Sequence, residues 1–316
     1  MPVAIHLDRV VKRYGATTAL DGLSLQVARG EMFGLIGPDG AGKTTTIRLL
    51  CGLLHADAGT VRVLGLDPVR EHRALTDRVG YLSQRFSLYG DLSIDENIAF
   101  FAEIHGVGDY ARKRDRLLDM TQLTPFRTRP AAQLSGGMKQ KLALACTLIH
   151  EPELILLDEP TTGVDPVSRR EFWKLLSEFL ATGITILMST PYLDEAERCA
   201  RVALLHEGRV VAYDEPSRLR ASMDGTFFEV LAPHPSDALA RLRGHAPGTR
   251  VQLFGERLHV WMPEQDARAA SAALSALTAG AGIHPHGVRA ITPSLEDVFI
   301  ARIAGADEAP TARPPS

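Results

Sequence analysis

The chain has 316 residues, with 35 Lys and Arg against 38 Asp and Glu, so its formal net charge is −3 at pH 7. That balance excludes a strongly basic nucleic-acid-binding protein, and we expect no nucleic-acid partner. Hydrophobic residues make up 45% of the chain and charged residues 23%, which is ordinary globular usage with enough apolar side chains for one large core or two smaller ones. Wholesale disorder is excluded as well.

The apolar runs are short. The longest of them, at 154–157 and 184–188, fall well short of the roughly 18 residues that a bilayer span needs, so we expect the chain not to cross a membrane by itself. No long apolar segment follows the basic residues near the N-terminus. A secretory signal is therefore not supported, and a cytosolic chain is the expectation.

Cysteine and histidine form no pattern typical of a metal site. Cys51, Cys146 and Cys199 stand far apart, with no CxxC and no nearby His at ligand spacing, and we interpret them as buried thiols. His284 and His286 form one close pair, which is at most half of a metal site. The preferred interpretation is that these two histidines lie in a turn.

Residues 3 to about 216 alternate short aliphatic runs with longer amphipathic stretches, which predicts an α/β domain. Buried strands are predicted at 32–37, 154–158, 184–190 and 202–214, the last as a hairpin turned at Glu207 and Gly208. The first three are apolar throughout, as expected of strands covered on both faces. Stretches with helical spacing lie at 43–53, 93–104, 109–123, 137–150, 167–182 and 193–199.

Composition changes near 214–225, which we interpret as a connector. The residues that follow alternate as strand, helix, two strands, helix, strand and helix. This order predicts a small α+β unit of the ferredoxin-like, split βαβ type. Residues 305–316 lack an apolar period, and we expect a loose tail there.

A glycine-rich segment, GPDGAGKTT at 37–45, directly follows a predicted strand and opens a predicted helix. In that context glycines let backbone amides curl around anionic oxygens, and the helix adds the positive end of its dipole. Lys43 supplies a point charge to the outer phosphates, and Thr44 can offer its hydroxyl to Mg²⁺. A glycine-rich turn that binds nothing is the alternative, and the strand, loop and helix in sequence disfavour it.

A second acidic motif, LILLDEP, ends a predicted strand in Asp158 and Glu159, on the usual ligand side of an α/β sheet. Asp158 would hold Mg²⁺ through water, and Glu159 would orient or deprotonate the attacking water. An acidic strand end before a proline turn is the structural alternative. The phosphate loop earlier in the chain disfavours it.

LSGGM at 134–138 lies between these two motifs, and with it the sequence resembles the nucleotide-binding subunit of an ATP-binding cassette (ABC) transporter. Ser135, Gly136 and Gly137 would form a hydroxyl-and-amide nest at a helix start, suited to a γ-phosphate presented by another subunit. A flexible helix cap is the alternative. The resemblance covers residues 3 to about 215.

The resemblance implies a set of site residues with ATP and Mg²⁺ as cofactors. Tyr14 would stack on adenine, Gln84 would link the metal to a transmembrane partner, and Asp165 would cross the dimer. Read alone, the first two are an ordinary strand-end tyrosine and a surface glutamine. The nucleotide-binding set is Tyr14, Gly37, Pro38, Asp39, Gly40, Ala41, Gly42, Lys43, Thr44, Thr45, Ser135, Gly136, Gly137 and Asp165. The metal set is Thr44, Gln84 and Asp158, and the catalytic set is Glu159, Lys43 and Gln84.

The same resemblance implies a P-loop NTPase fold of the ABC type over residues 1–222, with a helical subdomain at about 85–150. We expect a small α+β accessory domain at 223–304. TPSLEDVFI at 292–300 resembles the extension of cassette subunits from bacterial drug-export systems whose membrane partners are separate polypeptides. A generic dimerisation or stability appendage is the equal alternative.

Two positions depart from the family pattern. Pro191 stands where the family generally has a histidine, and proline has no donor for a γ-phosphate. Asp39 replaces the usual loop asparagine and adds a negative charge near the polyphosphate, unless it faces solvent. Both changes predict a slow site on this chain, and therefore a heterodimer with a better equipped cassette in preference to a homodimer.

The function expected from these motifs is energy coupling to a separate transmembrane permease, at the cytoplasmic side of the membrane. The permease is expected to dock at 85–97, where Phe86, Leu88 and Tyr89 form an apolar face; a loop buried within the domain is the alternative. A soluble nucleotide-gated cassette of translation or DNA repair is the second hypothesis. The paired cassettes or coiled-coil insertion usual in those proteins are not found here. A metabolic P-loop kinase would leave LSGGM without a phosphate to bind.

Overall fold

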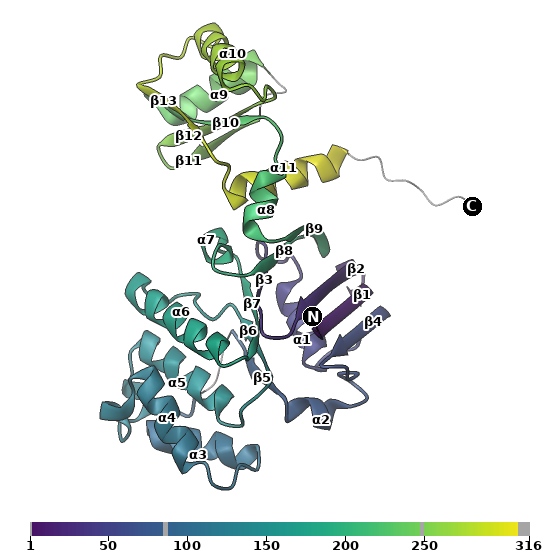
Figure 1. Cartoon of the computed structure of the whole chain (residues 1–316), viewed down its shortest axis with the longest axis vertical. Helices are drawn as coiled ribbons and strands as arrows, with labels where there is room; N and C mark the ends of the chain where they lie inside the picture. The colour runs from purple at the N-terminus through teal and green to yellow at the C-terminus, as the bar shows by residue number, and fades with distance from the viewer. Residues whose placement is uncertain (1, 85–87, 247–249, 309–316) are drawn as a thin grey trace, which may run out of the picture. The chain divides into compact units, whose positions relative to one another are not determined.

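The computed structural model describes residues 2–84, 88–246 and 250–308. The chain divides into two compact units, one made of Met1–Pro216 together with the chain from Arg302, and a second at Ser217–Ala301 (Figure 1). Each unit has its own sheet and its own hydrophobic core. Within the described ranges, no helix has both the length and the apolar content needed to cross a bilayer.

The first unit is built on a six-stranded sheet in the order β5-β6-β7-β3-β8-β9. Its strands are β5 (Val79–Leu82), β6 (Leu154–Asp158), β7 (Thr185–Thr190), β3 (Met32–Ile36), β8 (Arg201–His206) and β9 (Arg209–Asp214). Neighbouring strands pair in parallel except β8 and β9, which form the predicted hairpin. Glu207 and Gly208 both have positive φ at its turn, as a tight two-residue hairpin requires. β3, β6 and β7 are buried at every residue, as predicted for strands covered on both faces.

A second, antiparallel sheet completes this unit, in the order β2-β1-β4. It contains β1 (Val3–Tyr14), β2 (Thr17–Ala28) and β4 (Ala58–Val63), which the sequence analysis did not resolve. Helix α1 (Lys43–Leu50) contacts strands of both sheets, and one apolar cluster joins Leu7, Leu25, Phe33 and Leu156. The phosphate loop is therefore held between two sheets.

Cys51, Cys146 and Cys199 are buried free thiols, as predicted. Burial raises the pKa of each of them, that of Cys199 to about 12. A thiol whose pKa lies so far above neutrality is a poor nucleophile and a poor metal ligand. These cysteines belong to the core.

Helices gather on one part of the first unit, where α3 (Ile94–Ile104), α4 (Ala111–Thr121) and α5 (Gly136–Leu148) pack together (Figure 1). A capping box between Ser93 and Glu96 begins α3. The remaining elements of this unit are α2 (His72–Thr76), two short 3₁₀ turns (Thr124–Phe126 and Ala131–Gln133), α6 (Pro166–Ala181) and α7 (Leu193–Ala196). Helix α8 (Pro216–Ala221) spans the boundary to the second unit. All six predicted helical stretches are observed, with ends that differ by a few residues.

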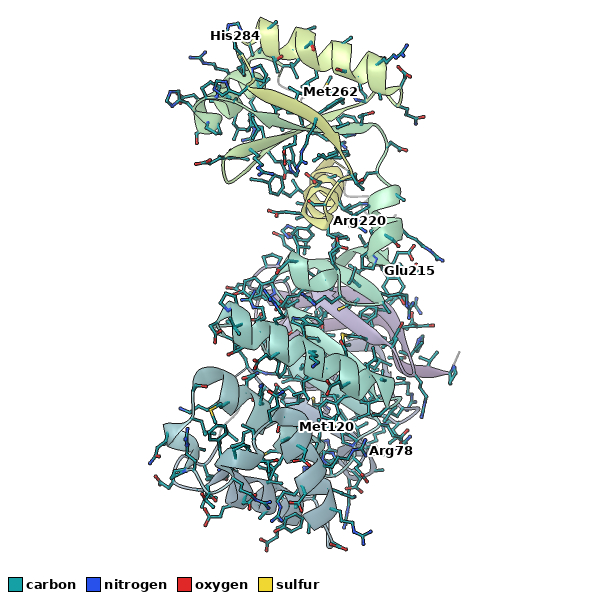
Figure 2. The ribbon with its side chains drawn as sticks, turned by 60° about the vertical axis from the view of Figure 1, so that its left-hand side comes forward. Arg78, Met120, Glu215, Arg220, Met262 and His284 are labelled. Atoms are coloured by element: carbon teal, nitrogen blue, oxygen red, sulfur yellow. The ribbon has the colours of Figure 1, made fainter. Side chains whose placement is uncertain are left out.

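The second unit has the predicted order of elements. These are β10 (Thr226–Leu231), α9 (Pro235–His245), β11 (Val251–Phe254), β12 (Arg257–Met262), α10 (Ala267–Gly280), β13 (Gly287–Ile291) and α11 (Leu295–Glu308). Its sheet is antiparallel in the order β11-β12-β10-β13. Met262 points from β12 into its apolar core, and His284 lies in the segment between α10 and β13 (Figure 2).

The expectation of a loose tail from residue 305 was wrong for its first part, because α11 continues to Glu308. Ala306 and Glu308 favour helix, and the helix already running from Leu295 needs no new nucleus to extend. Residues 309–316 lie outside the described part of the chain.

Candidate functional site

The loop between β3 and α1 has a backbone that only glycine permits at its last position. Gly42 has φ +103°, and a Cβ there would meet Leu20 Cδ2 at 2.6 Å and the Ala19 carbonyl oxygen at 2.8 Å. Thr46 donates its hydroxyl to the Gly42 carbonyl at 2.9 Å. The loop is thereby held against β2 and the first turn of α1.

Lys43 is buried beneath this loop, with a side chain only 3% exposed. Its Nζ donates to the carbonyls of Gly37 and Pro38 at 2.8 and 3.0 Å, and it lies 3.0 Å from Oε1 of Glu159. All of these partners are oxygen atoms. An ammonium so placed is suited to the oxygens of a polyphosphate.

The other loop positions differ in exposure. Pro38 and Gly40 are exposed, Ala41 is buried, and Thr45 is half-buried in the first turn of α1. Ala41 accepts a hydrogen bond from the Gly208 amide at 3.1 Å, which ties the loop to the β8–β9 hairpin.

Asp158 ends β6 and is 1% exposed. Its Oδ1 accepts from the hydroxyls of Thr44 at 3.1 Å and Ser189 at 2.7 Å. Burial raises the pKa of Asp158 above its ordinary value, and these two hydroxyl donors oppose that shift. Ser189 was missed by the sequence analysis, although it stands opposite Asp158 in the parallel pair of β6 and β7.

Glu159 follows in a left-handed backbone conformation, with φ +49°. Its amide donates to Oγ of Ser189 at 3.0 Å, which holds this turn in place. Its carboxylate accepts from Nε2 of Gln84 at 3.1 Å and from the hydroxyl of Thr162 at 3.4 Å. Gln84 comes from the end of β5, so two adjacent strands deliver the predicted carboxylate and amide to one place.

The predicted metal ligands are part of the same network. The hydroxyl of Thr44, the carboxylate of Asp158 and the amide of Gln84 are hard donors of the type that Mg²⁺ accepts together with phosphate oxygens and water. Over the described ranges, no group of three or more His, Cys, Asp or Glu side chains forms a metal cage. The residues present therefore fit an ion that arrives with a nucleotide.

A further buried carboxylate, Glu195, accepts a hydrogen bond from the turn after Glu159 and was not predicted from the sequence. Glu195, on α7, is 1% exposed and accepts from the hydroxyls of Thr161 at 2.7 Å and Thr190 at 2.6 Å. It also accepts from the indole of Trp173 at 3.3 Å, and Nε of Arg169 lies 3.7 Å away. Glu195 therefore joins the residues after Glu159, the end of β7 and helix α6.

Pro191 follows β7 directly and is half-buried. The preceding residue, Thr190, accepts a weak hydrogen bond from the amide of Gly37 at 3.4 Å. The position where the family has a histidine is thus next to the phosphate loop. Here it carries a side chain with no donor.

Ser135 is the exposed N-cap of α5 and accepts from the amide of Met138 at 3.3 Å. Gly136 and Gly137 form the first turn. A Cβ on Gly137 would collide with Oγ of Ser168 on α6, so this close approach of the two helix starts requires glycine.

Asp165 is the exposed N-cap of α6 and accepts from the amides of Val167 and Ser168, each at 3.0 Å. Hydrogen bonding from the Ser168 side chain, then from its amide and the Val167 amide, lowers the pKa of Asp165. Tyr14 is 46% exposed at the end of β1, with Nζ of Lys12 5.7 Å from its ring centroid. Asp39 is exposed too. Thus Lys43, Thr44, Gln84, Asp158 and Glu159 are brought together in the described structure. Tyr14, Asp39, Ser135 and Asp165 are exposed and lie outside this network.

The predicted docking segment is described only in part, because Arg85 and Phe86 lie outside the described residues. Leu88 is half-buried, and Tyr89 is 48% exposed. The Tyr89 ring packs edge-on against Phe100 at 4.5 Å, and its backbone is held by the buried Asn97.

A phosphate loop between a buried strand and a helix, opposite an Asp-Glu strand end, defines a P-loop nucleotide-binding cassette. The family model described as ABC transporter matches residues 20–162. DrrA3 of Streptomyces coeruleorubidus, named as a daunorubicin resistance ATP-binding protein, is 39% identical over 94% of this chain and 95% of its own length. The chain belongs to the ABC transporter family.

Three further similarities bear on the extent of the match. YbhF of Escherichia coli (strain K12), named as a probable multidrug ABC transporter ATP-binding protein, is 42% identical over 96% of this chain; the chain spans only 52% of its length. A solved structure described as the ATP-binding subunit of an ABC transporter is 32% identical, with a TM-score of 0.63, and covers 69% of this chain and 92% of its own. The cassette structure of cbiO1 from Clostridium perfringens is 26% identical, with a TM-score of 0.65 over 78% of this chain and 97% of its own.

Proposed function

We propose that this chain is the ATP-binding and ATP-hydrolysing subunit of an export system, and that it energises a separate transmembrane permease from the cytoplasmic side of the membrane. The observation that carries the proposal is the meeting of Lys43, Gln84 and Glu159 at one edge of the sheet. Relatives named for Nod factor export, daunorubicin resistance and multidrug transport support export as the direction of transport. The cargo would contact the permease, so its chemistry is set there.

In this proposal each residue of the network has one task. Lys43 binds the outer phosphates, and Thr44, Gln84 and water held by Asp158 bind Mg²⁺, which would neutralise phosphate charge. Glu159 orients or deprotonates the attacking water, as its place at the strand end suggests. Tyr14 supplies a stacking surface for adenine.

The exposed caps Ser135 and Asp165 support a dimer in which each chain completes the site of its neighbour. We favour a heterodimer. Pro191 removes a donor from this chain's own site, while its LSGGM segment is intact and can serve a partner's phosphate loop. The segment 217–301 is then an accessory unit beyond the cassette.

The first test is ATP turnover by the purified chain without a partner. We expect Mg²⁺-dependent ATP binding and slow hydrolysis, with Glu159→Gln retaining binding and losing the residual hydrolysis. Brisk hydrolysis by the lone wild-type chain that Glu159→Gln abolishes would contradict the asymmetric pair. Absence of Mg²⁺-dependent ATP binding would contradict the function as a whole.

The second test is fractionation with and without a co-expressed permease. Membrane association that depends on the permease supports energy coupling. Association with ribosomes or DNA would instead support a soluble cassette protein.

A further inference from the structure

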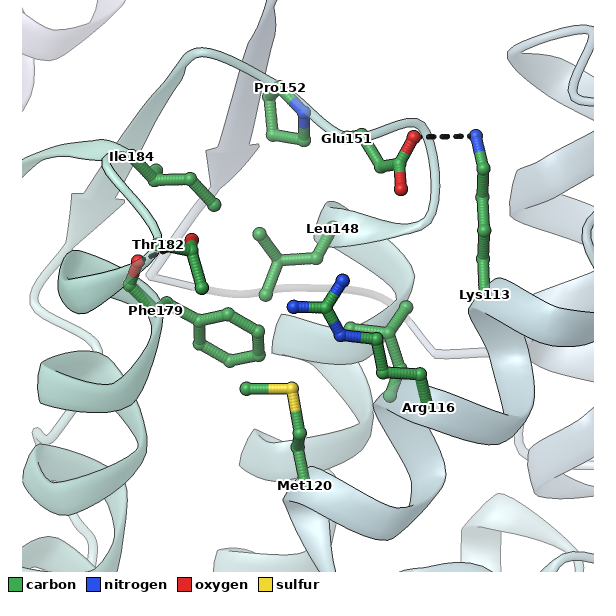
Figure 3. A pocket seen from close by; sticks show the side chains of 10 residues that line it. Lys113, Arg116, Met120, Leu148, Glu151, Pro152, Phe179, Thr182 and Ile184 are labelled. Atoms are coloured by element: carbon green, nitrogen blue, oxygen red, sulfur yellow. Dashed lines mark hydrogen bonds and ion pairs between the residues drawn. The ribbon is translucent and has the colours of Figure 1, made fainter.

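A cavity of about 210 Å³ lies in the first unit, away from the phosphate loop, between α4, the last turns of α5 and α6, and the residue before β7 (Figure 3). Met120, Leu148, Phe179 and Ile184 form its apolar wall. Leu148 and Phe179 are themselves buried, at 4% exposure each. The wall is thus fixed by the same packing that joins the helical part to the sheet.

Two cations from one face of α4 border this cavity, and their situations differ. Nζ of Lys113 lies 2.8 Å from Oε2 of Glu151, so this pair is neutral as a whole. Arg116 is exposed, and in the described chain it has no ion pair or hydrogen bond. Figure 3 shows its guanidinium extended over the cavity, toward Leu148 and Phe179. One uncompensated positive charge therefore faces an apolar hollow.

The C-terminal ends of α5 and α6 lie beside the cavity, but their partial negative charge offsets little of the positive charge of Arg116. The Leu148 carbonyl already accepts from the amide of Glu151 at 2.9 Å, and the Phe179 carbonyl accepts from both the amide and the hydroxyl of Thr182. Terminal carbonyls that already accept hydrogen bonds expose less partial negative charge, so they repel an anionic ligand less. Arg116 also offers five donors in a planar fork that matches a carboxylate.

We propose that this cavity binds a small amphipathic carboxylate, with its chain against Leu148 and Phe179 and its carboxylate on Arg116. The volume is below the roughly 300–1,000 Å³ of pockets for drug-sized ligands, so a medium-length chain fits better than a long one. Each methylene that is buried favours binding, and the guanidinium selects an anionic head over a neutral one.

Helices α5 and α6 connect this cavity to the nucleotide site, so occupancy of the cavity is expected to affect the site. This consequence rests on the proposed function. α5 and α6 reach it with their C-terminal ends, and their N-terminal ends carry Ser135 and Asp165. α5 has 13 residues, or about 20 Å at 1.5 Å per residue. A ligand that contacts α4, α5 and α6 together restricts their relative movement. It thereby changes the positions that Ser135 and Asp165 adopt toward a neighbouring chain.

Isothermal titration of the full chain with octanoate, and with 1-octanol as the uncharged probe of equal length, tests the site. We expect octanoate to bind at least about tenfold more tightly than 1-octanol, because its carboxylate gains a charge-assisted pair with arginine. Arg116→Gln should remove this preference and leave 1-octanol binding unchanged. Arg112→Gln, an exposed position on the same helix that does not border the cavity, is the matched control.

Met120→Trp, which fills the cavity from α4, should weaken both probes at least about fivefold. Equal affinity for the two probes, or an octanoate affinity that survives Arg116→Gln, overturns the proposal. Because Arg116 is exposed, its variant tests the site even if Met120→Trp does not fold. Mg²⁺-ATP binding is measured on the same samples, so a failure of this site is distinguishable from a failure of the proposed function.

Discussion

Nζ of Lys43 and Oε1 of Glu159 are 3.0 Å apart, with side chains 3% and 8% exposed. This buried pair joins the phosphate loop to the carboxylate at the end of β6. The cation that would bind phosphate and the base that would act on water are thus positioned by one another as well as by their strands. Removing the charge of either residue is therefore expected to alter stability, and a change at Lys43 is expected to weaken nucleotide binding as well.

Lys43→Ala should lower the free energy of unfolding by about 3–5 kcal/mol, because it leaves Glu159 buried without its partner. It should also weaken Mg²⁺-ATP binding about 10- to 100-fold, since one charge-assisted contact is lost. Urea denaturation and equilibrium nucleotide titration measure the two effects. The double variant Lys43→Met with Glu159→Gln should recover more than half of the lost stability; simple additivity of the two single changes would show that the pair is not coupled.

Pro191→His should raise ATP turnover about 100- to 1,000-fold, the usual effect of one preorganised donor to developing charge. The measurement is steady-state phosphate release with any required partner cassette held constant. Pro191→Ala is the matched control, because it removes the ring and restores the backbone N–H that any residue other than proline has, but adds no side-chain donor. If alanine raises turnover as much as histidine does, the backbone restriction by proline is responsible and the donor is not.

Glu195→Ala should destabilise the protein by about 3–5 kcal/mol, because it removes the acceptor of three donors, two of them from the buried Thr161 and Thr190. Glu195→Gln keeps one acceptor oxygen and should cost less. We also expect Glu195→Gln to lower kcat for ATP more than it raises KM, since the residues that it orders flank Glu159 and Pro191. Asp194→Asn, a neighbouring exposed carboxylate, should change neither value.

The ring of His150 stacks on His105, with centroids 3.9 Å apart. Burial, and next the neighbouring His105, lowers the pKa of His150 from 6.5 to about 4. Between these two values the unfolded chain binds a proton that the folded chain does not, so stability falls as the pH drops through that window.

Between pH 7 and pH 5 the wild type should therefore lose about 1 kcal/mol more unfolding free energy than His150→Gln does. Urea denaturation at the two pH values measures the difference. His55→Gln, at an exposed histidine, should behave like the wild type. Equal losses in the wild type and His150→Gln would exclude His150 as the group responsible.

The parts of the site whose residues are contiguous in the sequence were predictable, because their geometry is local. The strand, the glycine turn and the helix that hold Lys43 are contiguous, and their conformation follows from residues such as Gly42, where only glycine fits. The strand end at Asp158 and Glu159 was predictable for the same reason, from four apolar residues that stop at two carboxylates. The order of elements in the second unit followed from alternation and turns.

The long-range contacts were decided by the tertiary structure alone. Ser189 contacts Asp158 only because β6 and β7 pair in register. Glu195 accepts hydrogen bonds from β7, from α6 and from the turn after Glu159. Their residue types carry no local signal, since a serine or glutamate of this kind is typical of exposed positions. A one-dimensional pattern records which groups neighbour each other along the chain, while burial and hydrogen bonding depend on which segments the fold brings together.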